Sequence, residues 1–231
     1  MITLAGSLLT GTNDWLFQSV ELELFPGGWS CLLGPSGVGK TTILRLLAGL
    51  ETHGEFQGRI NTARCSYMAQ QDLLMPWLNV MGNVTLGAKL RGEEIDTQRA
   101  RELIEQVGLT EHADKYPGQL SGGMRQRASL ARTLMEDQDL VLLDEPFSAL
   151  DAKKRADMQE LAHELLGGKT VMLVTHDPAE AARLGNRNLI MNESGLHAMP
   201  AKTISNILAP EASETLNLQS SLLVELRKAA A

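Results

Sequence analysis

The chain has 231 residues, a formal net charge of −7 and a sequence pI of about 5.3. Apolar residues make up 43% of the chain and charged residues 21%, the balance of a protein that folds around a core as one large domain or two small ones. An acidic chain offers no basic surface to a phosphate backbone, so we do not expect nucleic acid as a partner.

The sequence has only two cysteines, Cys31 and Cys65, too few for a disulfide framework. Both lie among apolar residues, so we expect them to be core residues of a protein in a reducing cytosol. Residues 1–10 lack the basic and apolar regions of a signal peptide. No stretch reaches the roughly 20 apolar residues that span a bilayer. A role at a membrane would therefore depend on a partner.

The first clear unit along the chain is a short apolar run followed by a glycine-rich turn and an amphipathic segment. The run at residues 29–33 predicts a buried strand, and the apolar spacing within residues 41–50 predicts a helix. A strand, a turn and a helix in this order open an α/β unit.

The turn fits the phosphate-loop pattern G-x-x-x-x-G-K-[ST], whose backbone N–H groups wrap a polyphosphate at the start of a helix. Lys40 is expected to reach the β- and γ-phosphates, and the Thr41 hydroxyl to ligate Mg²⁺. A chance glycine-rich turn is the alternative, but it would not require the flanking strand and helix. The predicted nucleotide-binding residues of this loop are Gly34, Pro35, Ser36, Gly37, Val38, Gly39, Lys40, Thr41 and Thr42.

The middle of the chain, residues 72–135, predicts helices at 97–107 and 124–135 and no clear buried strand. Near its end, a serine and two glycines open a helix, which leaves free N–H groups and a hydroxyl for an anion. An ordinary serine cap is the alternative. The residues of this second loop are Leu120, Ser121, Gly122, Gly123 and Met124.

The apolar run Leu140–Leu143 predicts a buried strand that ends in Asp144 and Glu145. Asp144 is expected to hold Mg²⁺ through its water shell, and Glu145 to act as general base on an attacking water. An acid after a strand is usually a helix cap or a solvated turn. The phosphate loop is what favours the catalytic interpretation.

The remaining elements complete an alternating pattern. Strands are predicted at 171–175 and 189–191, and helices at 151–166 and 213–228.

Together these motifs resemble those of the ATP-binding cassette (ABC) ATPases over about residues 15–195. Residues 120–124 resemble the LSGGQ signature of that family, with Met124 in place of the commoner glutamine. The resemblance implies a single α/β domain, residues 1–231. Within it we expect a RecA-like core (1–71 and 136–231), a helical subdomain (72–135) and a small N-terminal antiparallel β portion.

The resemblance also implies how the motifs work. In a head-to-tail dimer, each signature would cap the γ-phosphate held by the other chain. His176 would contact the γ-phosphate and help orient Glu145 or the water, and Gln70, rather than the adjacent Gln71, would touch Mg²⁺ and the water. The loop that would cross the dimer interface, the D-loop, is Ser148, Ala149, Leu150 and Asp151.

Two tryptophans each leave two interpretations open. The family usually stacks adenine on an aromatic residue before the first core strand, and Trp15 is the candidate, but it could instead be a core anchor. Phe17 is expected to face the core. Pro76 and Trp77 lie in a stretch, residues 73–84, that resembles importers of the nitrate, sulfonate and taurine group, including carriers of thiamine-pyrimidine precursors. Trp77 is predicted either to contact a membrane subunit or to be a core residue.

The predicted function is ATP hydrolysis to ADP and phosphate, with ATP and Mg²⁺ as cofactors, in an importer of a small anionic or heterocyclic solute. Expected partners are a second copy of the chain, transmembrane permease subunits and, indirectly, a periplasmic binding protein. The expected location is cytoplasmic, peripheral on the inner face of the membrane. Alternatives are a stand-alone P-loop kinase or GTPase, a soluble ABC protein of DNA repair or translation, and a non-catalytic cassette.

Overall fold

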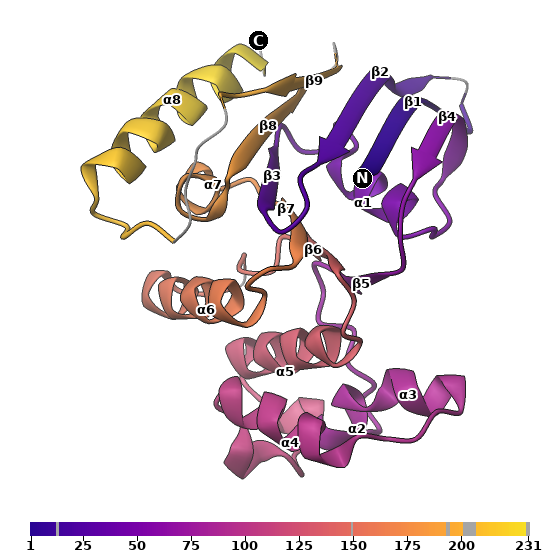
Figure 1. Ribbon diagram of the computed structural model, residues 1–231, viewed down its shortest axis with the longest axis vertical. Helices are drawn as coiled ribbons and strands as arrows, with labels where there is room; N and C mark the ends of the chain where they lie inside the picture. Colours follow the sequence, from indigo (N-terminus) through magenta and orange to yellow (C-terminus); the bar gives the residue numbers. More distant parts are fainter. Residues whose placement is uncertain (13, 149, 193–194, 201–206, 230–231) are drawn as a thin grey trace.

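The computed structural model describes residues 1–12, 14–148, 150–192, 195–200 and 207–229. It contains two β-sheets, with one group of helices below them in the view of Figure 1. The α/β fold expected from the sequence is confirmed. Within the described part of the chain, no helix is long and apolar enough to cross a membrane.

The larger sheet has six strands in the order β5-β6-β7-β3-β8-β9. Neighbours from β5 to β8 are parallel, and β9 pairs antiparallel with β8. Its strands are β3 (Trp29–Leu33), β5 (Cys65–Met68), β6 (Leu140–Asp144), β7 (Thr170–Val174), β8 (Arg187–Asn192) and β9 (Gly195–Ala198). Every residue of β3, β6 and β7 is buried, which explains their continuous apolar runs. The four predicted strands are confirmed, and β5 and β9 are additional.

The smaller sheet is antiparallel, in the order β2-β1-β4. Its strands are β1 (Ile2–Thr10), β2 (Trp15–Leu24) and β4 (Gly54–Asn61). The side chains of β2 that enter the core are Phe17, Val20, Leu22 and Leu24, an alternating pattern in its second half that fits a sheet with one covered face. The expected small antiparallel portion is thus present, and Phe17 faces the core as predicted.

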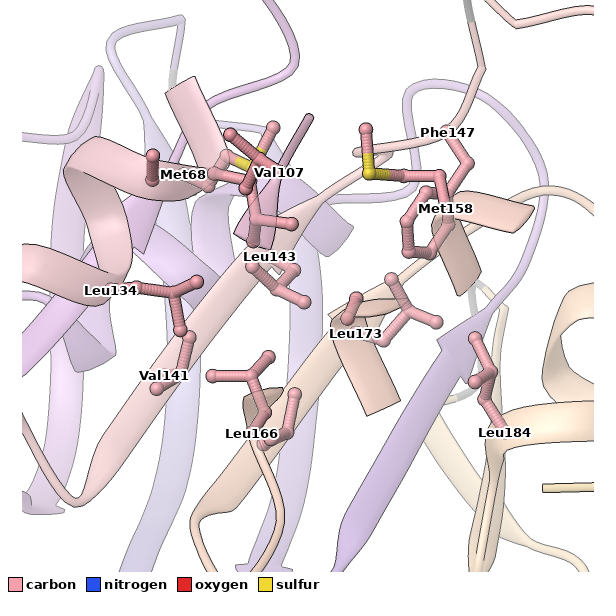
Figure 2. Close-up of a cluster of buried hydrophobic side chains, with 14 of the residues drawn as sticks. Met68, Val107, Leu134, Val141, Leu143, Phe147, Met158, Leu166, Leu173 and Leu184 are labelled. Atoms are coloured by element: carbon pink, nitrogen blue, oxygen red, sulfur yellow. The ribbon is translucent and has the colours of Figure 1, made fainter. Parts of the chain in front are cut away.

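Helices cover the larger sheet on both faces. They are α1 (Lys40–Leu47), α6 (Ala152–Leu165), α7 (Pro178–Leu184) and α8 (Ser213–Ala229). Because side chains alternate along a strand, each strand contributes to two separate cores. Leu142 packs in the core that contains α1 and the smaller sheet. Its neighbour Leu143 points the other way and lies near Phe147, Met158 and Leu173 in the opposite core (Figure 2).

Residues 72–135, all of them described, contain helices and no strand, as expected. The α-helices are α2 (Val80–Val84), α3 (Leu86–Arg91), α4 (Thr97–Gln106) and α5 (Gly122–Met135). The side chains of Asn79, Asp96 and Ser121 cap α2, α4 and α5 by accepting a backbone N–H from the first turn. These helices form the lower group in Figure 1, with α5 packed against β5.

Two expectations need correction. The helix predicted at 41–50 ends at Leu47, because Gly49 adopts a left-handed conformation (φ 66°) that stops it. Cys31 is buried as expected, but Cys65 is only partly buried because it starts β5 at the edge of the larger sheet. Both cysteines are free thiols.

Candidate nucleotide-binding site

The predicted phosphate loop joins β3 to α1 at the carboxyl edge of the larger sheet. Two of its glycines are sterically required. A Cβ atom on Gly34 would lie 2.3 Å from the carbonyl oxygen of Met191, and one on Gly39 would lie 2.9 Å from Cδ1 of Phe17. Gly39 also has a φ of 107°, which side chains disfavour. Ser36 and Gly37 at the tip are exposed, so the loop is open towards solvent.

Lys40 begins α1 and folds back over its own loop. Its Nζ atom donates to the carbonyl oxygens of Gly34 at 2.8 Å and Pro35 at 2.7 Å. Burial lowers the pKa of Lys40, while the charges of Glu145 and Asp144 oppose that shift. The Lys40 Nζ atom is thus held at a loop that has no acidic residue in the first turn of α1. That combination favours an anion.

Thr41 and Asp144, predicted as metal-binding residues, lie side by side. The Thr41 hydroxyl donates to Oδ1 of Asp144 at 3.1 Å, although the two residues lie 103 positions apart in the sequence. The Tyr67 hydroxyl donates to Oδ2 of the same carboxylate at 3.3 Å. Burial raises the pKa of Asp144, and these two hydrogen bonds oppose that shift. Burial together with the Asp144 charge raises the pKa of Tyr67 to about 12.

This oxygen pair fits Mg²⁺, which prefers hard oxygen ligands and retains much of its water. In the described residues, no group of three or more His, Cys, Asp or Glu side chains is placed to hold a metal. Thr41 and Asp144 would therefore share the ion with water and with phosphate oxygens, as in phosphate-loop sites generally.

The three predicted catalytic side chains meet at one atom, although they follow three different strands. Gln70 Nε2 donates to Oε2 of Glu145 at 3.1 Å, and His176 Nδ1 lies 3.0 Å from the same oxygen. They come after β5, β6 and β7, which are adjacent parallel strands, so their carboxyl ends share one edge. Glu145 has a φ of 45°, a left-handed conformation that is strained for a non-glycine residue and typical of functional sites.

The predicted D-loop follows directly. Both the backbone N–H and the hydroxyl of Ser148 donate to the Glu145 carbonyl, at 3.3 and 3.0 Å. Leu150 is buried, and Asp151 caps α6 by accepting the Lys154 N–H at 3.0 Å. Ala149 lies outside the described residues.

The second predicted anion loop opens α5. Ser121 is exposed and caps the helix, its Oγ accepting the Met124 N–H at 3.3 Å. Gly122 is also exposed, and Leu120 anchors the loop in the core. Among the described residues, no hydrogen bond joins residues 120–124 to the phosphate loop.

The two tryptophans prove to be surface residues. Trp15 is 44% exposed and Trp77 is 70% exposed, so neither is a core anchor. Trp15 begins β2, and the side chain of the next residue, Leu16, lies within van der Waals range of a Cβ built on Gly39. Trp15 therefore starts its strand close to the end of the phosphate loop.

Sequence reasoning missed Tyr67. It lies in β5, a four-residue edge strand whose weak pattern does not predict a strand. Burial alternates along Cys65–Met68 in the structure, but the buried positions include Ser66, so the sequence carries no matching pattern and does not indicate which partner the hydroxyl would find.

Comparison with known proteins identifies the family. The family model described as ABC transporter matches residues 17–148, more than half of the chain. An uncharacterised ABC transporter ATP-binding protein of Haemophilus influenzae is 44% identical over 99% of this chain and 96% of its own length. The aliphatic sulfonates import ATP-binding protein SsuB 1 of Rhodococcus jostii is 44% identical over 78% of this chain and 75% of its own.

A solved structure gives the same result. The ATP-binding cassette MJ0796, as a dimer in a post-hydrolysis state bound to ADP and Pi, superposes with a TM-score of 0.77 and 27% identity, over 88% of this chain and all of that chain. The resemblance and the ABC ATPase fold expected from the sequence are confirmed. The chain belongs to the ABC transporter family of ATP-binding, ATP-hydrolysing subunits.

Proposed function

We propose that this chain powers a bacterial importer of a small anionic or heterocyclic solute by hydrolysing ATP. The observation that carries the proposal is the meeting of Gln70 and His176 on one oxygen of Glu145, beside Lys40 and the Thr41–Asp144 pair. Relatives named for aliphatic sulfonate import, at 38–44% identity, support an organic anion as the solute class.

The residues divide into three roles. Residues 34–42 bind the phosphates, with Lys40 neutralising the β- and γ-oxygens. Thr41, Asp144 and Gln70 would hold Mg²⁺, which would supply further charge neutralisation. Glu145 accepts a proton from the water that attacks the γ-phosphorus, and ADP leaves as phosphate forms. His176 holds Glu145 in place and reaches the γ-phosphate, and Trp15 stacks on adenine.

The active unit in this proposal is a head-to-tail dimer. In the described part of the chain, the signature loop at 120–124 makes no hydrogen bond to the phosphate loop, and Ser121 and Gly122 are exposed, so a second chain would supply its partner loop. The dimeric state named for the solved cassette MJ0796 supports this arrangement. Residues 148–151 would then lie at the dimer interface.

Transport requires membrane subunits, and the exposed Trp77 is the contact we propose for them. It belongs to a helical subdomain, residues 72–135, set on a RecA-like core of residues 1–71 and 136–231. The chain would work on the cytoplasmic face of the membrane, with a periplasmic binding protein delivering the solute from the other side.

The proposal can be tested with the purified chain and Mg-ATP. We expect release of inorganic phosphate that requires Mg²⁺ and is lost when Lys40 is replaced by Ala. In vesicles with its permease and binding protein, an aliphatic sulfonate should stimulate that activity. Absence of ATPase activity from the folded protein, with and without the permease, would contradict the proposal. Activity that other solutes stimulate and sulfonates do not would correct the solute class alone.

A further inference from the structure

The segment that carries Gln70 is fastened to the helix that carries the signature. Oδ2 of Asp72, two residues after Gln70, accepts from Nε of Arg125 at 2.9 Å. Arg132, two turns further along α5, donates to the carbonyl oxygens of Asp72 at 2.7 Å and Leu73 at 2.8 Å. Three charge-assisted contacts therefore join one short loop to one helix.

The other end of this connection reaches the signature. Arg125 lies in the first turn of α5, and its Nη1 donates to the carbonyl of Leu120 at 3.1 Å. One guanidinium group thus holds the Asp72 carboxylate and the backbone just before Ser121. Arg125 therefore links Asp72 to the signature loop.

The loop itself is held in a strained turn. Leu73 has a φ of 45°, and Oδ1 of Asp72 accepts the Leu74 N–H at 3.2 Å across that turn. Leu73 is exposed, so packing of its side chain does not explain the conformation. The two carbonyl contacts of Arg132 lie on either side of the turn and fix it instead.

The ion pair is too exposed to serve mainly for stability. The side chains of Arg125 and Asp72 are 38% and 29% exposed, and pairs of this kind contribute little to the free energy of unfolding. Arg132 is more deeply placed, and burial lowers its pKa. These contacts therefore fit a role in positioning the loop against α5 better than a role in stabilising the fold.

We propose that Asp72, Arg125 and Arg132 are positioning residues that make the Gln70 loop and the signature helix move as one unit. The inference rests on the proposed dimer. Gln70 senses the nucleotide of its own chain through Glu145, while Ser121 completes the site of the other chain. The three residues, here called the α5 clamp, transmit a displacement at one site to the other.

The test compares Asp72→Asn, Arg125→Gln and the double variant in the full-length protein. Each single variant should lower kcat by about 10-fold, less than the roughly 100-fold that a 1 Å misplacement can cost. The affinity of the isolated chain for a fluorescent ATP analogue should stay within about twofold, because the clamp does not touch the phosphate loop. Because the two residues act as a pair, the double variant should be no slower than the slower single variant.

A matched control is Asp137→Asn, which breaks an ion pair between α4 and the end of α5. Asp137 lies 2.9 Å from Arg99 and 3.1 Å from Lys169 and is 55% exposed. Its φ of 49° is one that asparagine tolerates well. This variant should keep kcat within about twofold of the parent.

A second readout is dimer formation. In an otherwise Glu145→Gln protein with saturating ATP, adding Asp72→Asn should raise the protein concentration needed for dimerisation, measured by light scattering. Wild-type kcat in both clamp variants would overturn the inference. A fall in melting temperature large enough to unfold the variants at the assay temperature would also overturn it, because unfolding would then explain the lost activity. Absence of ATPase activity in the parent protein would instead contradict the proposed function.

Discussion

The Nδ1 atom of His176 lies 3.0 Å from Oε2 of Glu145, on a carboxylate whose backbone is already in a strained conformation. Gln70 donates to the same oxygen. Among the described residues, no hydrogen bond is made to Oε1. The contacts on Oε2 fix the carboxylate, and under the proposed role of Glu145 as general base Oε1 is the oxygen that takes the proton.

This relationship predicts the behaviour of Glu145→Gln. The amide cannot accept a proton, so kcat should fall by at least about 100-fold while Mg-ATP still binds. Trapped ATP should hold two chains together, visible as a dimer on size exclusion. Glu225→Gln is the control, because Glu225 pairs with Lys228 on α8, away from the site, and should leave turnover unchanged. Near-parental turnover of the Glu145 variant would show that another group is the base.

A second prediction concerns Trp15, which is exposed beside the end of the phosphate loop. If its indole stacks on adenine, Trp15→Ala should weaken ATP binding by about 1–3 kcal/mol, the scale for bases stacked on aromatic side chains. ATP should also change the fluorescence of Trp15. Trp77→Ala removes another exposed indole, outside the site, and should not alter affinity. Equal ATP affinity in the two folded variants would exclude stacking by Trp15.

A third prediction concerns the pH dependence of stability. Arg99 and Lys169 donate to Asp137 and lower its pKa from 3.8 to about 2. A carboxylate whose pKa is lowered by folding stabilises the fold above its unfolded pKa, and this contribution is lost as the pH falls from about 4 to about 2. Because Asp137 is 55% exposed, solvent screening limits the contribution to about 1 kcal/mol.

Asp137→Asn should therefore be less stable than the parent by up to about 1 kcal/mol at pH 7, and the difference should shrink below pH 4. Urea unfolding at several pH values measures it. A difference that stays constant down to pH 2 would mean that the ionised carboxylate is not its source.

The local motifs were predictable because each consists of consecutive residues. The loop at 34–41 and the acids at 144–145 follow fully buried strands, whose uniform apolar runs are the clearest strand signal. The predicted carboxyl-edge position of His176 also follows from a buried strand, β7. Once the order of β5, β6 and β7 is known, the meeting of Gln70, Glu145 and His176 follows.

The missing parts depend on contacts between distant residues. Tyr67 reaches Asp144 across 77 positions, and Asp72 reaches Arg125 across 53. Charged and hydroxyl side chains carry no periodic signal that names their partner, so only the folded topology shows these pairs. The strands β5 and β9 were missed because four residues at a sheet edge are too short for a pattern.

The last prediction tests whether Ser121 acts on nucleotide held by another chain. Ser121 is exposed and caps α5, and in the described residues it makes no hydrogen bond to the phosphate loop, so replacing it with Arg should leave ATP binding at the Lys40 loop nearly unchanged. Turnover should nevertheless collapse, because the γ-phosphate loses its second set of donors and the water is no longer enclosed. Binding is measured on the isolated chain and turnover by phosphate release.

Mixing the Ser121→Arg chain with a Lys40→Ala chain then separates action within a chain from action across the dimer. In a mixed dimer, one composite site joins the intact phosphate loop of the first chain to the intact signature of the second, while the other site carries both defects. Partial ATPase activity should return on mixing, although neither variant is active alone. Strict coupling between the sites would suppress that recovery, so the binding measurement decides in that case. Loss of ATP affinity in the isolated Ser121→Arg chain would place Ser121 in its own chain's site, and the head-to-tail dimer would have to be abandoned.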